Sequence, residues 1–171
     1  VTETVDVPRR PAGGRACVMT AANLKGGSTK TSTTMCLGQG LALRGHKVLV
    51  IDLDPQGTLT QFFGMLPDSE VAEDSTVGPL CLGDYADLEY AVKKDTYFAG
   101  LHLIAASPAL FGAEFALPAQ QVRNPDRFRF WDVLNEGLQP LRQEYDAIII
   151  DTSPSLSYLT LNALFAADGL I

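Results

Sequence analysis

The chain has 171 residues, of which 46% are hydrophobic and 19% charged, and its formal net charge is −7. This composition is ordinary for a globular domain and excludes a chain that is disordered throughout. The negative charge argues against strong nucleic-acid binding by this segment alone, although a local basic face would be compatible with it.

No apolar run approaches the roughly 18 residues that a membrane-spanning helix needs, and the sequence predicts no signal peptide. The three cysteines, Cys17, Cys36 and Cys81, form no CxxC pair. We therefore expect a cytoplasmic protein whose cysteines are reduced thiols in the core.

Both ends of the sequence have the character of a fragment. Residues 1–15 contain prolines, glycines and two adjacent arginines without periodicity, which indicates a linker or disordered tail. Residues 168–171 read as a strand that is only beginning. We expect one domain at 16–171, incomplete at its C-terminus.

Apolar strands and helices are predicted to alternate along the first half of the chain. The predicted elements are, in order, a buried strand at 16–22, a glycine-rich turn at 23–30, a helix from 31 to about 44, a strand at 47–52 and a short helix that stops near Gly64. Gly45 stands where a left-handed residue commonly ends a helix.

The second half continues this alternation after an acidic, irregular stretch at 67–87. The predicted elements are, in order, a helical turn at 88–93, a strand at 101–105, a helix from 108 to about 121, a longer helix from about 126 to 144, a strand at 147–150 and a helix at 158–166. Strands separated by helices predict an α/β fold with a mostly parallel sheet and right-handed crossovers.

Polar segments follow three of the predicted strands. They are the glycine-rich turn at 23–30, Asp54 with the residues after it, and Asp151 with the residues after it. Because the carboxyl ends of parallel strands meet at one edge of a sheet, these segments should converge on one ligand site.

The turn between the first strand and the first helix, Lys25-Gly26-Gly27-Ser28-Thr29-Lys30-Thr31, has the chemistry of a phosphate-binding loop. Glycines let backbone N–H groups point at phosphate oxygens at a helix N-terminus, where the helix dipole adds attraction. A lysine then neutralises the β- and γ-phosphates and a neighbouring hydroxyl coordinates Mg²⁺, roles that fit Lys30 and Thr31. The common pattern GxxxxGK[ST] fails here, since its two glycines would fall on Leu24 and Thr29.

The same loop resembles the deviant Walker A motif of the ParA/MinD family of ATPases. Residues 51–57 resemble the second motif of that family, residues 145–156 its Walker B region, and residues 161–168 the helix and strand that come next. The resemblance runs from about Cys17 to Ile171, and it implies a three-layer P-loop NTPase fold and ATP hydrolysis.

The resemblance also implies roles for individual residues. Lys25 would be the signature lysine, which reaches the nucleotide of the other subunit of a dimer, and Asp54 would orient the attacking water, so that Lys25, Lys30 and Asp54 form the catalytic set. The nucleotide would be bound by Gly26, Gly27, Ser28, Thr29, Lys30, Thr31 and Ser32. The Mg²⁺ site would comprise Thr31, Asp54 and Asp151. For Asp52, a metal-supporting role through water and a structural role at the strand end are both open.

Thr29 departs from the family, which usually has glycine before the Walker lysine. If this position needs a positive φ, a β-branched residue there costs about 1–3 kcal/mol. The departure predicts a slower ATPase or an altered nucleotide affinity.

The function that the resemblance implies is that of a ParA-type partition ATPase in plasmid or chromosome segregation. Mg-ATP binding would drive homodimerisation and non-specific DNA binding on the nucleoid, and a ParB-type adaptor would stimulate hydrolysis. The alternatives are a MinD-like or other deviant Walker ATPase, and a nucleotide-dependent switch with little turnover because of Thr29. A dinucleotide site at Gly38-x-Gly40 and an iron–sulfur site at Cys81 fit less well, and His46 and His102 have no evident partners for a metal site or a catalytic triad.

Overall fold

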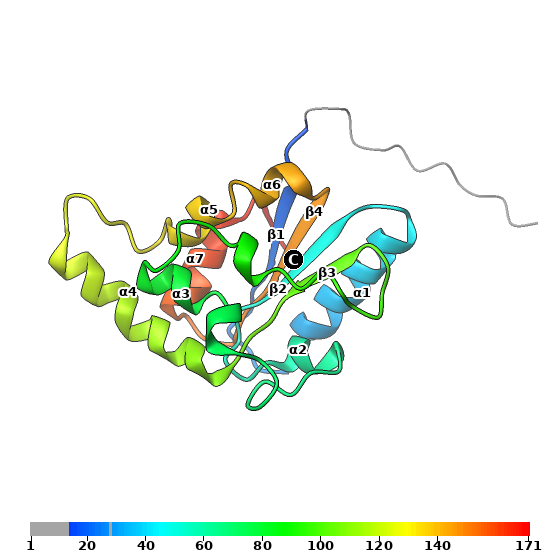
Figure 1. Ribbon diagram of the computed structural model, residues 1–171, viewed down its shortest axis with the longest axis horizontal. Coiled ribbons are helices and arrows are strands. Elements are labelled where there is room, and N and C mark those ends of the chain that lie inside the picture. The colour runs from blue at the N-terminus through cyan, green and yellow to red at the C-terminus, as the bar shows by residue number, and fades with distance from the viewer. Residues whose placement is uncertain (1–13, 28) are drawn as a thin grey trace, which may run out of the picture.

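Five strands form a parallel sheet at the centre of this computed structural model, which describes residues 14–27 and 29–171 (Figure 1). They are β1 (Cys17–Ala21), β2 (Val48–Asp52), β3 (Leu101–Ile104), β4 (Ala147–Asp151) and β5 (Gly169–Leu170), in the spatial order β3-β2-β4-β1-β5. Strand β4 therefore lies between β1 and β2, and at its end Asp151 pairs with both Ala21 and Asp52. This order brings the segments after β1, β2 and β4 to the same edge.

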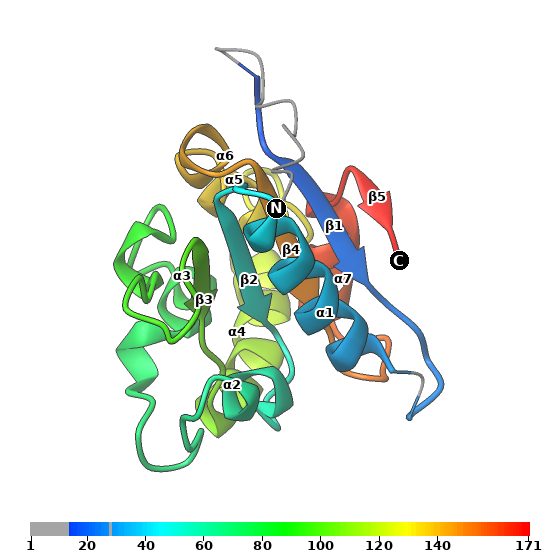
Figure 2. The same cartoon turned by 90° about the vertical axis from the view of Figure 1, so that its right-hand side faces the viewer.

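Helices cover both faces of the sheet. They are α1 (Lys30–Leu43), α2 (Thr58–Phe62), α3 (Gly78–Leu82), α4 (Phe111–Arg123), α5 (Val133–Gly137), α6 (Leu141–Glu144) and α7 (Tyr158–Ala166). Single 3-10 turns occur at Glu73–Ser75, Glu89–Ala91 and Pro108–Leu110. Figures 1 and 2 show α1 on one face, and α4 and α7 on the other. The three-layer α/β fold expected from the sequence is confirmed.

Strand β2 shows why its sequence is apolar throughout. Val48 and Val50 pack in the core beneath α1 and α2, while Leu49 and Ile51 pack in the opposite core beneath α4 and α7. All five residues of the strand are buried. A strand covered on both faces has no outward-facing polar positions, so it shows no alternation.

Most predicted elements are confirmed to within one or two residues. Helix α7 has the predicted bounds, α1 begins one residue early, and Gly45 has the expected positive φ of 86°. The expected linker at 1–15 lies outside the described residues except for its last two positions.

The prediction of an irregular stretch at 67–87 is wrong in part, because it contains the short helix α3. Composition concealed α3, because its five residues include a glycine and a proline and lie within an acidic stretch. The predicted helical turn at 88–93 is confirmed as the 3-10 turn Glu89–Ala91, after which Lys93 pairs antiparallel with Leu103.

The predicted long helix at 126–144 is also wrong, because the chain forms only the short helices α5 and α6 there. Gly137 ends α5, and Pro140 immediately precedes α6. Since proline has no N–H to donate, it cannot continue the hydrogen-bonded ladder of the preceding helix.

The cysteines are free, but only Cys81 is buried, and Cys17 and Cys36 are exposed. The expectation that all three are core thiols is therefore wrong for two of them. Cys17 opens β1 at the end of the sheet, and Cys36 lies on the outward side of α1, next to the buried Met35.

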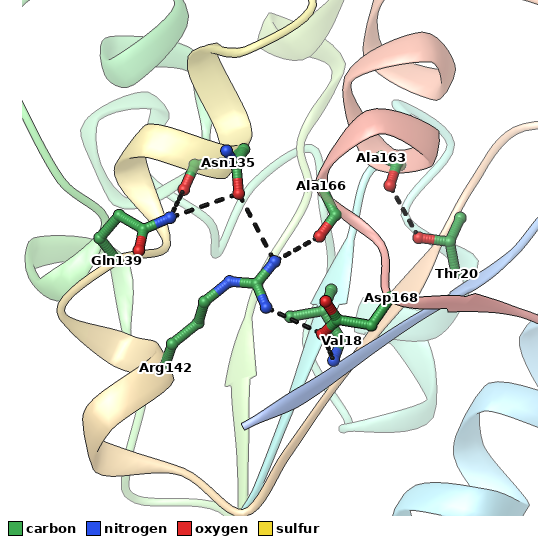
Figure 3. A network of polar contacts seen from close by, with 8 residues as sticks. All are labelled: Val18, Thr20, Asn135, Gln139, Arg142, Ala163, Ala166 and Asp168. Atoms are coloured by element: carbon green, nitrogen blue, oxygen red, sulfur yellow. Dashed lines mark hydrogen bonds and ion pairs between the residues drawn. The ribbon is translucent and has the colours of Figure 1, made fainter. Parts of the chain in front are cut away.

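A buried arginine joins the last strand to the rest of the fold (Figure 3). Arg142 of α6 is 1% exposed, and its Nη1 donates to Asp168 Oδ2 at 2.9 Å. Its Nη2 donates to the carbonyl oxygen of Ala166 at 2.5 Å, and Asp168 Oδ2 also accepts from the Val18 N–H at 2.8 Å. One guanidinium thus connects α6, the end of α7 and the start of β5, and the Asp168 carboxylate extends the connection to β1.

Candidate nucleotide site

A cavity of about 390 Å³ lies at the carboxyl ends of the strands, where the sequence predicts a ligand site. It is lined by Gly27, Thr29, Lys30, Thr31, Ser32, Asp54, Thr58, Phe62, Thr152 and Pro154. The phosphate loop, the loop after β2 and the loop after β4 all contribute, so the predicted convergence is present.

Six of the residues assigned from the sequence line this cavity: Gly27, Thr29, Lys30, Thr31, Ser32 and Asp54. Gly26 and Lys25 are exposed and are not among the lining residues. Asp151 lies buried at the end of β4 beside the cavity, and Ser28 lies outside the described residues.

The phosphate loop is organised around Asn23, which the sequence did not single out. The Lys30 ammonium donates to the carbonyl oxygen of Asn23 at 3.2 Å, and the Lys25 N–H donates to its Oδ1 at 2.9 Å. Helix α1 begins at Lys30, so the N–H groups of its first turn face the cavity. Such a helix N-terminus is suited to bind an anion.

Thr29 has a left-handed backbone, with φ 61° and ψ 14°. Among the described residues it is the only non-glycine with a positive φ. This conformation brings the β-carbon close to the following carbonyl and costs about 1–2 kcal/mol in an L-residue. The positive φ that was the condition for a conformational cost at Thr29 is therefore present.

Replacing Thr29 with glycine is expected to raise the free energy of unfolding by up to about 1.5 kcal/mol. Glycine removes about 1–2 kcal/mol of left-handed strain, while the greater freedom of the unfolded chain costs about 0.4–1 kcal/mol. Urea denaturation measures the change. Thr29→Ala is the matched control, because it keeps a β-carbon and should gain no stability. A glycine variant no more stable than the alanine variant would show that the loop is not strained.

Asp151 is a carboxylate buried at the end of β4. The residue is 1% exposed, and neither side-chain oxygen has a hydrogen bond of good geometry within the described chain. Burial raises the pKa of Asp151 to about 6; the Thr31 hydroxyl opposes this shift, the Asp54 charge adds to it, and the Lys30 ammonium opposes it. Buried polar groups without hydrogen bonds are rare in proteins. A cation bound next to Asp151 would compensate its buried charge.

The residues around Asp151 fit Mg²⁺ in particular. No group of three or more His, Cys, Asp or Glu side chains suited to hold a metal occurs in the described parts of the chain. Mg²⁺ requires no such group, because it keeps several waters and uses one or two protein oxygens together with phosphate oxygens. The Thr31 hydroxyl and the Asp151 carboxylate can supply those oxygens.

Asp54 and Asp52 have different surroundings. Asp54 lines the cavity, and its Oδ1 accepts from the Gln56 N–H at 3.0 Å, so the carboxylate both caps its turn and faces the ligand space. Asp52 is fully buried, and its oxygens accept from the Asp54 N–H and from the N–H and hydroxyl of Thr60. Burial raises the pKa of Asp52 to about 7. Of the two roles left open for Asp52, these contacts support the structural one.

The features behind the rival interpretations have structural explanations. A β-carbon on Gly38 would lie 3.0 Å from Val50 and 3.1 Å from Leu101, so a small residue lets α1 pack closely on the sheet. His102 is engaged in a side-chain hydrogen bond, since its Nδ1 lies 2.7 Å from the Tyr145 hydroxyl. His102 is on β3 and Tyr145 lies two residues before β4, at the opposite end of the strands from the cavity.

Several lining residues were not predicted from the sequence: Thr58, Phe62, Thr152 and Pro154. Thr152 and Pro154 could have been identified from the sequence, because they follow Asp151 at the end of a predicted strand. Phe62 could not, because an apolar residue on a short amphipathic helix is expected to face the core.

The sequence profile of a family described as AAA domain (AAA_31) matches residues 16–171. The chromosome partitioning protein ParA of Myxococcus xanthus is 38% identical over 154 residues, covering 90% of this chain and 50% of that protein. Protein SopA of Escherichia coli K12 is 36% identical over 148 residues, covering 86% of this chain and 38% of SopA. The chain thus spans half or less of the length of these two relatives.

Among solved structures, a cobyrinic acid a,c-diamide synthase from Mycobacterium smegmatis with bound ATP analogue and magnesium has a TM-score of 0.79. It is 36% identical, and the match covers 91% of this chain and 57% of that one. In the part of the chain that the structure describes, no helix has the length and apolar character needed to cross a membrane.

Proposed function

The chain belongs to the AAA domain family, within the ParA/MinD group of P-loop ATPases, and we propose that it binds Mg²⁺-ATP and hydrolyses it to ADP and phosphate. One observation carries this proposal. The buried Asp151 carboxylate, for which the described residues provide no hydrogen bond of good geometry, lies beside a cavity that also holds the N-terminus of α1 and the Lys30 ammonium. This arrangement offers anion and cation sites side by side, as a metal–phosphate ligand requires.

Each residue of the site has a part in this reaction. The N–H groups at the start of α1, with Gly26 and Gly27, would bind phosphate oxygens, and Ser32 would reach the α-phosphate. Lys30 would leave the Asn23 carbonyl for the β- and γ-phosphates. Thr31 and Asp151 would hold Mg²⁺, with Asp54 at the edge of the metal site, and the ion would neutralise charge on the phosphate oxygens.

Asp54 would orient the attacking water with the carboxylate oxygen that does not bond Gln56. The water oxygen would form a bond to the γ-phosphorus while the bond between that phosphorus and the β–γ bridging oxygen breaks. ADP would leave with the bonding electrons, one proton of the water would stay on the phosphate, and the other would pass to solvent. The half-buried position of Asp54 at the cavity wall supports this role.

Lys25 would act on the nucleotide of a second copy of the chain. Its side chain is exposed and does not line the cavity of its own chain, which supports delivery in trans. Developing negative charge on a transferred phosphoryl group is stabilised by such a cation. Mixing Lys25→Ala with Asp54→Ala protein tests this: a mixed dimer contains one site with both residues, so partial turnover should return. Lysine acting within its own chain would leave the mixture inactive.

The ATPase cycle would serve partition of a plasmid or chromosome. ATP-driven dimers would bind DNA without sequence preference on the nucleoid, in the cytoplasm, and a ParB-type adaptor would stimulate hydrolysis to release them. The name of the relative from Myxococcus xanthus, chromosome partitioning protein ParA, supports this role. If DNA binding occurs, its affinity should fall steeply with salt concentration.

Separate measurements of ATP binding and ATP turnover test the proposal, with and without Mg²⁺, DNA and the adaptor. Mg²⁺-dependent turnover that DNA and adaptor stimulate would support it. The second candidate is a nucleotide-dependent switch with little turnover, which the left-handed Thr29 favours. Tight ATP binding without stimulated turnover, in the wild type but not in Thr29→Gly, would decide for the switch.

A further inference from the structure

Thr60 connects the carboxyl ends of two strands through its hydroxyl. The residue lies on α2 and is fully buried. Its Oγ1 donates to Asp52 Oδ2 at 2.8 Å and accepts from the Ala106 N–H at 2.9 Å. The first contact reaches the end of β2, and the second reaches the segment after β3.

The Asp52 carboxylate fixes both ends of the loop that carries Asp54. Its Oδ1 accepts from the Asp54 N–H at 3.1 Å, and its Oδ2 accepts from the Thr60 N–H at 2.9 Å. Between these points the chain turns at Gly57, which has a φ of 65° and packs against Pro67. The position of Asp54 at the cavity therefore depends on the Asp52–Thr60 pair.

The loop after Asp151 is held from the same side of the sheet. Ala106 leads through the 3-10 turn Pro108–Leu110 into α4. Glu114 of α4 accepts from the Tyr158 N–H at 2.8 Å and the Leu159 N–H at 3.1 Å, the first N–H groups of α7. The loop between Asp151 and α7 therefore ends on α4.

The two loops and α4 also border a second cavity of about 420 Å³. Its walls are formed by residues 54–56 and Thr58 of the first loop, residues 153–155 and Ser157 of the second, and Phe111 and Glu114 of α4. The loops are thus adjacent in space, and segment 106–114 lies against both of them.

We infer that Thr60 and Glu114 are positioning residues, which fasten the Asp54 loop and the loop after Asp151 to one common element, segment 106–114. The inference rests on the proposed ATP hydrolysis, for which the water-orienting Asp54 and the loop after Asp151, with Thr152 and Pro154 on the cavity wall, must keep fixed places. Displacing reacting groups by about 1 Å can cost on the order of 100-fold in rate. Neither Thr60 nor Glu114 lines the proposed nucleotide cavity, so their effect on ATP affinity should be small.

Thr60→Val is the main test, because valine keeps the shape of the side chain and loses the hydroxyl. We expect kcat to fall by on the order of 100-fold while the dissociation constant of ATP stays close to that of the wild type. Thr60→Ser retains the hydroxyl and should recover most of the turnover. Equal losses in the serine and valine variants would overturn the inference.

Glu114→Gln tests whether both loops are held through the same element, segment 106–114. Because both residues act through segment 106–114, the rate losses of Thr60→Val and Glu114→Gln should not multiply in the double variant. Losses that multiply in full would mean that the two loops are held independently, and the inference would fail.

Amide hydrogen exchange separates this inference from the proposed function. In Thr60→Val, exchange should accelerate at Tyr158 and Leu159 as well as at Ala106, whether or not the protein hydrolyses ATP. A wild type that binds ATP without turnover would defeat the proposed function and leave this readout intact. Acceleration confined to Ala106 and α2 would defeat the positioning inference alone.

Discussion

Replacing Asp54 with alanine is expected to lower kcat by about 100- to 10,000-fold, the range over which a group that handles a reacting proton contributes. The side chain lines the cavity, and the Gln56 N–H occupies only one of its oxygens. ATP binding should persist or tighten, because the variant removes a negative charge close to the phosphates. A rapid-quench assay gives the rate, and a nucleotide titration gives the affinity.

Asp54→Asn sharpens this test. Asparagine can still accept from the Gln56 N–H, so the turn is kept while the charge is lost. Asp68→Ala is the matched control, since Asp68 is exposed beyond α2 and should leave kcat unchanged. Near-normal turnover in the asparagine variant would remove Asp54 from the catalytic set and leave the loop with a purely structural role.

Replacing Asp168 with alanine is expected to lower the free energy of unfolding by about 3 kcal/mol. Removing one partner of a buried ion pair costs about 3–5 kcal/mol, because the other charge stays buried without compensation. The Arg142 side chain is 1% exposed, but that of Asp168 is 48% exposed. Water can reach the vacated position, so the lower end of the range applies. Urea denaturation measures the loss.

The double variant Arg142→Met/Asp168→Ala is the control for this explanation. It removes the uncompensated charge as well, and should recover much of the stability. If it is as unstable as Asp168→Ala, then the backbone contact of Asp168 with Val18 matters more than the ion pair.

The contribution of the Asp168–Arg142 ion pair to the free energy of unfolding should decrease at acidic pH. Burial alone would raise the pKa of Asp168, but the Val18 N–H and the Arg142 guanidinium outweigh it and lower the pKa below its ordinary value. The stabilisation is therefore complete above the unfolded pKa of about 3.9 and is lost as the pH falls through the lower folded pKa. The stability gap between wild type and Asp168→Ala should narrow over that acidic range.

The sequence predicted the parts of the fold in which local pattern and tertiary role agree. Strands β2 and β4 are apolar because both faces are covered, and the pattern shows this directly. Thr29 was identified from one motif position, and its left-handed backbone was found there. In each case the residue type follows from a single local requirement, which the sequence pattern shows without knowledge of distant partners.

Other features depend on partners distant in sequence. A charged residue such as Arg142 is expected at the surface of a helix. It is buried here because its guanidinium pairs with Asp168, which is 26 positions away. Asn23 contributes a backbone carbonyl to Lys30, which any residue could supply. Thr60 is notable only once Asp52 and Ala106 are known to lie beside it. No local pattern carries such information.

The place of β4 between β1 and β2 has a consequence for folding during synthesis. The phosphate loop emerges early, but the strand that supports it on its inner side is residues 147–151, and the Thr152 hydroxyl bonds the Ala21 carbonyl across 131 positions. Such non-local pairing is slow to form, because the intervening chain must first be closed into a loop. A nascent chain that has not yet reached Ala147 should therefore lack a competent nucleotide site, however much of the β2–β3 pair has formed on the ribosome.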